Sequence, residues 1–353
     1  MAGEEPQGLP KSVISMTESD KGRTRRIGFL LIDGFALMSF ASAIEPLRAA
    51  NVLAGRALYD WVTIGIGRHE VMASSGFAVR AQHLAGADIE LDTVFVCAGG
   101  NPATFADETA LNWLRRLARR GVRIGGVSGG PFILARAGLL AGYRCTIHWE
   151  HVPAFVETYP DLNVRRSLYE IDRDRLTCAG GVAALDMMHA MISAEHGRAL
   201  ADEIGEWFLQ TEVRLGTGAQ RRSLQDRYDT SNARLLTALD LIETHIEDPL
   251  DRRALSTAAG VSVRQLERLF AAHLGKSLER HYRDVRLDRA RLLLRQTTLS
   301  VSEVGLASGF QSASHFSRAF KARFGHAPAL ERARRHPAGE GAQLARFGRA
   351  DRR

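Results

Sequence analysis

The sequence predicts a flavodoxin-like α/β domain followed by an all-α domain with two helix-turn-helix units. Between about residues 26 and 211, short apolar runs alternate with helical stretches. This pattern is typical of a parallel sheet covered by helices on both faces. Further on, residues 260–275 (GVSVRQLERLFAAHLG) and 309–325 (GFQSASHFSRAFKARFG) are near-copies of each other, which indicates one structural unit used twice.

The elements of the first domain follow each other in a regular order. Each expected strand is a buried apolar run, and several end in glycines. The expected strands are 27–34, 60–67, 92–100, 122–130 and 176–181, and the expected helices are 38–51, 107–120, a helix ending at Leu140, 182–196 and 199–211.

Polar segments set the expected domain boundaries. Residues 1–25 and 337–353 are expected to be disordered tails. Residues 212–231 contain two glycines and lack an apolar face, so we expect a linker there. This leaves residues 26–211 and 232–336 as the two domains.

Composition and cysteine usage indicate a cytoplasmic protein. The chain has 353 residues, of which 45% are hydrophobic and 25% are charged, as in globular proteins. No apolar run approaches the ~20 residues of a membrane span, and the N-terminus has no hydrophobic signal core. Three cysteines without close spacing, Cys97, Cys145 and Cys178, indicate a reducing compartment. We therefore expect a cytoplasmic location and no membrane partner.

Positive charge is concentrated in the second domain. The whole chain has a net charge of +7, whereas residues 252–335 hold 15 Arg and 2 Lys against 6 acidic residues. A basic module on a mildly acidic body is typical of a DNA-binding domain joined to another domain. A solvated basic face would give the same count, so charge alone does not decide.

Each near-copy has the parts of a helix-turn-helix. A short helix precedes a turn glycine, Gly260 or Gly309, and a serine, Ser262 or Ser312, then caps a second helix. The expected second helices span 263–273 and 313–324. Their apolar positions face the core, which leaves polar side chains free to reach base edges in a major groove. These are Arg264, Gln265, Glu267 and Arg268 on the first helix, and Ser314, His315, Arg318 and Lys321 on the second.

A helix over residues 277–297 is expected to connect the two units, with its arginines facing outward. Such a rigid support would hold the two second helices about one DNA turn, ~34 Å, apart.

Residues 232–335 resemble the AraC-type DNA-binding domain throughout, in IEDPL, GVSVRQLERLF and RLDRARLLLRQTTLSVSEVGLASGFQSASHFSRAFKARFGHAP. The resemblance implies a transcription regulator that binds double-stranded promoter DNA and acts with RNA polymerase. It places Arg264, Glu267 and Arg268 in one groove, and Ser314, His315 and Arg318 in the next. The ending ALERARR (329–335) departs from the usual aromatic-containing one, which concerns packing more than base reading.

The first domain contains a turn that could present a nucleophile. Ser128 stands between glycines in GGVSGGPFILARAGLL, at a strand-to-helix bend. The segment CAGGN (97–101) could supply N–H donors opposite it. The same bend could instead bind a polar group of a ligand. His148 and His151 are the candidate bases, but no acid is placed to orient them, so we expect no enzyme; a Ser128-dependent amidase or protease is the alternative.

Residues 26–210 resemble the class I amidotransferase-like superfamily, which includes PfpI-type proteases. That family has a cysteine at the bend, commonly followed by histidine, and an acid after the first strand. The corresponding residues here are Ser128, Gly129 and Ser39. The resemblance therefore implies that the fold is kept and the reaction lost.

With both domains together, nearly the whole chain resembles the GlxA-type regulators of the AraC family. The segments 36–51, 146–151 and 177–188 are similar to members that control betaine or carnitine catabolism. This implies a dimeric activator with a small effector such as a betaine, carnitine or amino acid.

A cationic effector needs an aromatic face and a nearby carboxylate. The expected ligand-binding residues are Ser128, Gly129, Gly99, Gly100, Glu45, His148 and Trp149. Trp149 as a core aromatic residue is an equally open interpretation. The spacing of Cys145, His148 and His151 hints at a metal, but they lie on one short stretch without a fourth ligand. We expect no metal and no cofactor.

Overall fold

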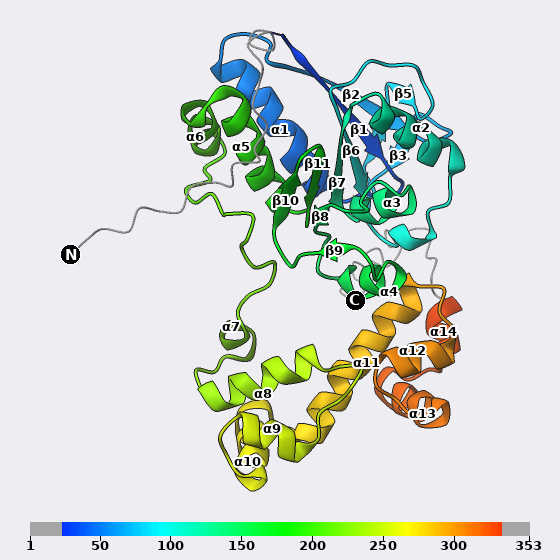
Figure 1. Ribbon diagram of the computed structural model, residues 1–353, viewed down its shortest axis with the longest axis vertical. Coiled ribbons are helices and arrows are strands. Elements are labelled where there is room, and N and C mark those ends of the chain that lie inside the picture. The colour runs from blue at the N-terminus through cyan, green and yellow to red at the C-terminus, as the bar shows by residue number, and fades with distance from the viewer. Residues whose placement is uncertain (1–22, 334–353) are drawn as a thin grey trace, which may run out of the picture. The chain divides into compact units, whose positions relative to one another are not determined.

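The computed structural model describes residues 23–333, which form two compact units dividing between Gln220 and Arg221. Figure 1 labels their elements. The expected tails, 1–25 and 337–353, lie outside the described residues except for residues 23–25, and the first strand already begins at Arg25. None of the helices within residues 23–333 combines the length and apolar character needed to cross a membrane.

Unit 1 is built on a seven-stranded sheet of order β10-β11-β7-β6-β1-β2-β5. Neighbouring strands are parallel, except that β10 runs antiparallel to β11. The strands are β1 (Arg25–Leu31), β2 (Tyr59–Gly65), β5 (His83–Leu84), β6 (Thr93–Ala98), β7 (Arg123–Ser128), β10 (Tyr169–Asp172) and β11 (Arg175–Cys178).

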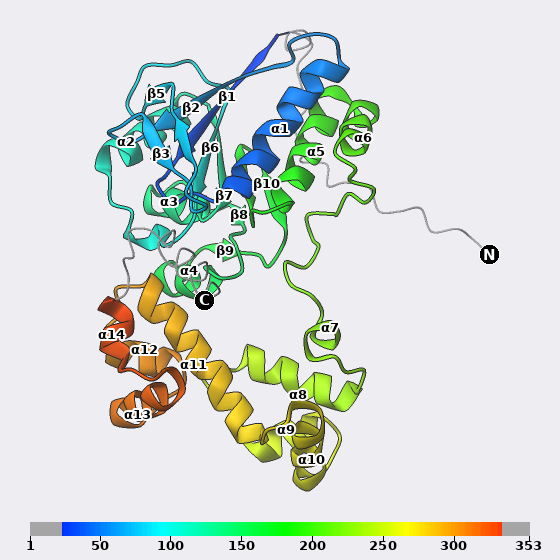
Figure 2. The same ribbon diagram turned by 180° about the vertical axis from the view of Figure 1, so that it is seen from behind.

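Helices cover both faces of this sheet (Figures 1 and 2). α1 (Leu37–Leu53), α5 (Ala183–His196) and α6 (Arg198–Trp207) pack together on one face, and α2 (Glu108–Arg119) and α3 (Gly130–Arg136) lie on the other. Residues of α1, α5 and α6 form one continuous buried core with residues of β1 and β6. Because both faces are covered, β6 and β7 are buried at every position. The α/β prediction is confirmed.

Several short elements were not predicted. In unit 1 they are β5 and β10 of the main sheet, β3 (Glu70–Met72), β4 (Ala78–Arg80), β8 (Arg144–Cys145), β9 (Asn163–Val164), the 3-10 helix η2 (Pro102–Thr104) and α4 (Val152–Thr158). The helix expected to reach Leu140 ends at Arg136 instead. Gly138 adopts a φ of +74° just beyond it, a left-handed conformation that closes helices.

The described part of unit 2 contains helices and no strand, as predicted. Its helices are α7 (Leu224–Tyr228), α8 (Ala233–Thr244), α9 (Arg252–Ala258), α10 (Val263–Leu274), α11 (Leu278–Gln296), α12 (Val301–Ala307), α13 (Ala313–Phe324) and α14 (Pro328–Ala333). Leu235 and Leu239 of α8, Leu266 and Phe270 of α10 and Tyr282 of α11 share one buried cluster.

The expected linker, residues 212–231, is not a free connection. Its first part belongs to unit 1, where Arg214 binds Asp186 and Gln220 binds the backbone of Ile147. Its second part contains α7, whose Leu224 and Tyr228 pack against the core of unit 2. The expectation of no apolar face was wrong there, because these two apolar residues are spaced for one face of a single helical turn.

Candidate functional site

The first helix-turn-helix consists of α9 and α10. Gly260 turns the chain with a φ of +66°, and the Ser262 side chain accepts a hydrogen bond from the backbone N–H of Gln265. Gln265 completes a reciprocal capping box, because its Oε1 accepts from the backbone N–H of Ser262 at 2.9 Å. Gly275 ends the helix in the left-handed conformation, with a φ of 64°.

The second unit, α12 and α13, repeats this layout. Gly309 turns the chain with a φ of +76°, and Ser312 caps α13 by accepting from the N–H of His315. Gly325 closes the helix with a φ of 79°. The predicted caps and turns of both units are therefore confirmed.

The exposed face of α10 is narrower than the sequence indicated. Arg264 and Arg268 are exposed, and neither has a carboxylate partner among residues 23–333. Gln265 is exposed but is occupied by its capping box. Glu267 was expected to be exposed and is half-buried instead. Its Oε2 accepts from the backbone N–H of Leu278 at 3.3 Å, so it caps the start of α11.

On α13 the four predicted residues are all exposed. They are Ser314, His315, Arg318 and Lys321. The Oγ of Ser314 lies 2.9 Å from that of Ser312, and the His315 ring meets the Phe310 ring edge-on. Within the described part of the chain, Arg318 and Lys321 make no ion pair. They are free to meet phosphates or base edges.

The 19-residue helix α11 supports both units. At 1.5 Å per residue it is about 28 Å long. Its N-terminal half packs in the cluster of α8 and α10 through Leu278 and Tyr282, and its C-terminal half contacts α12, α13 and α14. The expectation that its arginines face outward was wrong at Arg286. That guanidinium donates to the carbonyls of Ser308 and Gly309 and lies 4.1 Å from the Phe310 ring centroid, which ties α11 to the second turn.

A buried carboxylate fastens the other end of α11. Glu331 of α14 is fully buried and pairs with Arg291, Arg295 and His326. Burial raises the pKa of Glu331, but hydrogen bonds from these three groups outweigh it and lower the pKa to about 2.

In unit 1 the bend at Ser128 has the predicted geometry. Ser128 has a φ of 59°, which a non-glycine residue adopts only under constraint. A Cβ on Gly130 would lie 2.0 Å from the carbonyl oxygen of Val96, so glycine is required there. Gly180 covers the bend: a Cβ on it would meet Ser128 Cβ at 2.6 Å and Ser39 Oγ at 2.8 Å. Ser128 is consequently buried.

A small pocket lies beside this bend, where the chain leaves the carboxyl end of β11. Its volume is about 190 Å³, below the range usual for drug-sized ligands. The lining residues are His148, Trp149, Leu168, Ala179, Gly180, Gly181, Val182, Ala183, Arg214 and Gln220. The location fits the rule that ligands of α/β sheets bind beyond the carboxyl ends of strands.

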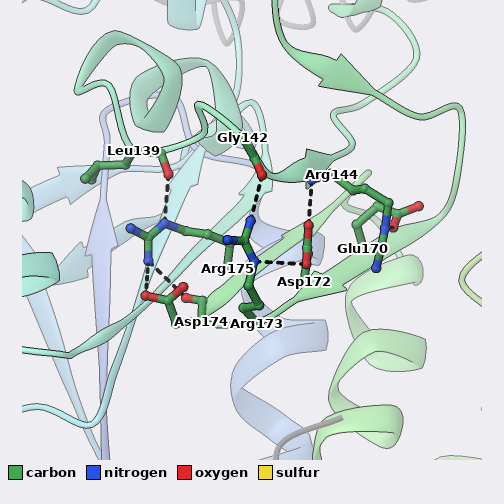
Figure 3. Close-up of polar contacts among 8 residues, drawn as sticks. All are labelled: Leu139, Gly142, Arg144, Glu170, Asp172, Arg173, Asp174 and Arg175. Carbon is green, nitrogen blue, oxygen red and sulfur yellow. Dashed lines mark hydrogen bonds and ion pairs between the residues drawn. The ribbon is translucent and has the colours of Figure 1, made fainter. Parts of the chain in front are cut away.

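The loop that precedes the segment carrying His148 and Trp149 is held by a polar network at the β10–β11 hairpin (Figure 3). Asp172 accepts from the backbone N–H of Arg144 at 2.8 Å, and Arg173 and Arg175 donate to the carbonyls of Gly142 and Leu139. Both guanidinium groups also lie over the Tyr143 ring. The loop before residues 146–151 is thereby fixed to the sheet edge.

The two histidines and the tryptophan of this segment differ in exposure. Trp149 is 41% exposed, so it is not a core aromatic residue. Burial lowers the pKa of His148, which Glu150 partly offsets, so the imidazole is neutral at neutral pH. His151 is buried, and its ring lies 5.9 Å from that of His148.

Of the seven expected ligand residues, the structure brings only His148 and Trp149 to the pocket. Glu45 is paired with Arg48 on α1 at 2.7 Å. Ser128, Gly129, Gly99 and Gly100 lie at the strand ends without lining it. Sequence reasoning missed Arg214 and Gln220, because both fall in the expected linker. Within residues 23–333, no three His, Cys, Asp or Glu side chains are grouped to hold a metal.

Comparison with known proteins agrees with both units. Residues 25–194 match the DJ-1/PfpI family, and residues 255–334 match a helix-turn-helix domain family. A crystal structure of an AraC family transcriptional regulator from Pseudomonas putida is 29% identical, with a TM-score of 0.48, over 52% of this chain and 99% of that one.

Two curated relatives span both units. The HTH-type transcriptional regulator GlxA of Rhizobium meliloti is 49% identical over 90% of this chain and 98% of its own length. The HTH-type transcriptional regulator CdhR of Pseudomonas aeruginosa is 43% identical over 86% of this chain and 90% of its own. These relatives are transcriptional regulators rather than enzymes. The chain belongs to the AraC-type family of DNA-binding transcriptional regulators, in the group that carries a DJ-1/PfpI domain before the helix-turn-helix region.

Proposed function

We propose that this protein is a ligand-responsive activator that binds promoter DNA in the cytoplasm and controls a catabolic operon for a small nitrogenous metabolite. The observation that carries the proposal is the pair of serine-capped helices, α10 and α13, on one support, α11; their Arg264, Arg268 and Arg318 make no ion pair with the described residues. Arg264, Arg268, Ser314, His315, Arg318 and Lys321 are the side chains that meet DNA. Gln265 and Glu267 act mainly by holding α10 and α11 in place.

The pocket of unit 1 is the proposed effector site. Arg214 uses Nε and Nη2 to bind Asp186, and its Nη1 has no acceptor among residues 23–333. That free N–H suits a carboxylate, and the exposed indole of Trp149 suits an ammonium group. Both features together favour a small zwitterion such as a betaine, carnitine or an amino acid. A homodimer would place two DNA-binding units on repeated half-sites, and activation would proceed through RNA polymerase.

A thermal-shift experiment tests the effector assignment. All four tryptophans, Trp61, Trp113, Trp149 and Trp207, lie in unit 1, so tryptophan fluorescence follows the unfolding of that unit. A zwitterion at about 100 times its Kd should stabilise unit 1 by roughly 2.7 kcal/mol, which is roughly 5–10 °C for a unit of this size. Choline is the matched control for glycine betaine, because it lacks the carboxylate. Equal shifts with both would contradict the role of Arg214.

The strained bend at Ser128 keeps a hydrolase as the second candidate. Ser128→Ala separates the two functions, because a nucleophile is indispensable for turnover and a buried structural serine is not. We expect the variant to keep effector-dependent transcription, with no hydrolysis of amide or ester substrates by either protein. Turnover by the parent that disappears in Ser128→Ala would favour the hydrolase.

A further inference from the structure

The chain between α6 and α7 forms a strap, defined here as residues 209–220, along the edge of unit 1. Leu209 reverses the chain with a φ of 57°, and the N–H of Leu168 donates to the carbonyl of Gly216 at 2.7 Å. A Cβ on Gly216 would lie 2.8 Å from the carbonyl oxygen of Tyr169. The strap is therefore packed backbone to backbone against the start of β10.

The first anchor of the strap is Asp186 on α5. Its carboxylate is fully buried and accepts from Gln210 Nε2 at 2.8 Å, and from the backbone N–H, Nε and Nη2 of Arg214 at 3.0, 3.0 and 2.6 Å. A buried carboxylate is stable only when its oxygens are satisfied in this way. The middle of the strap thus depends on one charge pair.

The second anchor is Gln220, the last residue of unit 1. Its Nε2 lies within hydrogen-bond distance of Thr146 Oγ1 (3.1 Å), the Ile147 carbonyl (3.0 Å) and the Ser167 carbonyl (2.7 Å). An amide has two N–H donors for these three acceptors. Its own Oε1 is buried and finds no donor within residues 23–333. This anchor is incompletely satisfied, because one buried acceptor of the Gln220 amide has no partner within the described residues.

Arg214, which Asp186 holds in place, and Gln220 both line the effector pocket, and unit 2 begins at the residue after Gln220. We propose that the strap is the coupling element through which pocket occupancy controls the DNA-binding unit. A carboxylate on Arg214 and a polar group beside Gln220 tighten both anchors, which fixes the point from which residue 221 departs. The inference rests on the proposed function, because it requires an effector in this pocket.

The coupling is measured on the full-length protein with glycine betaine, carnitine and L-arginine as probes. For any probe that binds, operator affinity is determined without probe and at saturation, in the parent and in Gln220→Ala. Allosteric coupling is typically 5- to 150-fold. Gln220→Ala should bind the probe more weakly, yet at saturation its operator affinity should be nearly independent of the probe. Gln225→Ala, an exposed glutamine on α7 outside the pocket, should couple like the parent.

The outcomes separate the two proposals. If saturated Gln220→Ala shows the parent's coupling, the strap does not transmit the signal, while the effector site stands. If no probe raises the melting temperature of unit 1 in the parent, the effector proposal fails, and the inference fails with it. Hydrogen exchange on the parent gives a check that needs no variant. The backbone N–H of Arg214 donates to Asp186, and that of Gly218 donates to the Leu215 carbonyl. A bound probe should slow hydrogen exchange at both N–H groups. Unchanged exchange with probe bound would overturn the coupling role.

Discussion

Replacing Arg318 or Arg268 with alanine is expected to weaken binding to the cognate DNA site by about 1–3 kcal/mol each, or roughly 5- to 150-fold. Each residue lies on the exposed face of a second helix and makes no competing ion pair within residues 23–333. A guanidinium in the major groove donates two hydrogen bonds to a guanine edge, which alanine cannot replace. Because the two arginines lie on different helices, their losses should add in the double variant.

The measurement uses fragments that the full-length parent selects from a random DNA pool, compared with a scrambled fragment. The loss should appear in the ratio of specific to non-specific affinity. The slope of log affinity against log salt concentration should change by no more than one phosphate contact contributes. Arg198→Ala is the control, because it removes one exposed positive charge from unit 1, which contains neither helix-turn-helix unit. Equal losses on both fragments would mean that these arginines contact phosphates only.

Replacing Glu331 with glutamine is expected to destabilise the α11–α14 region by roughly 3 kcal/mol at neutral pH, since removing one partner from a buried ion pair leaves the others uncompensated. Here three basic groups, Arg291, Arg295 and His326, surround one carboxylate. The two arginines are partly exposed, which places the expected cost at the low end of the range for buried pairs.

The effect should depend on pH with a definite sign. The folded-state pKa of Glu331 is about 2, lowered from 4.5, so its contribution is complete above about pH 4.5 and declines as the pH falls toward 2. In the full-length protein, the hydrogen-exchange rates of α11–α14 in the parent and in the variant should become more alike as the pH falls from about 4.5 toward 2. Asp240→Asn, at an exposed site on α8, should leave exchange unchanged. A pH-independent difference would mean that the loss comes from packing rather than charge.

The sequence predicted the fold wherever local chemistry determines it. The capping serines, Ser262 and Ser312, and the turn glycines, Gly260 and Gly309, each specify a backbone geometry by themselves. The strands β6 and β7 could also be predicted, because each is a long run of residues that are buried on both faces of the sheet. Strands of two to four residues, such as β5 and β10, carry too few positions for a periodicity to show.

Only some of the pocket residues could be predicted from the sequence. His148 and Trp149 were found through a local segment, whereas Arg214 and Gln220 reach the pocket only because Asp186, 28 residues before Arg214, holds the strap. A polar, glycine-containing stretch resembles a linker whether or not a distant carboxylate binds it. Glu267 shows the same limit: its position on α10 suggested a base contact, and its partner at Leu278 depends on where α11 begins.

Two side chains of α10, Gln265 and Glu267, are engaged in helix capping, so α10 tolerates fewer substitutions than α13. Substituting Gln265 or Glu267 would cost helix capping as well as altering the surface, whereas the matching positions, His315 and Ser317, take part in no capping box. A lineage acquiring a new operator can therefore vary α13 more freely than α10. Related regulators should share the bases facing α10 and diverge in those facing α13.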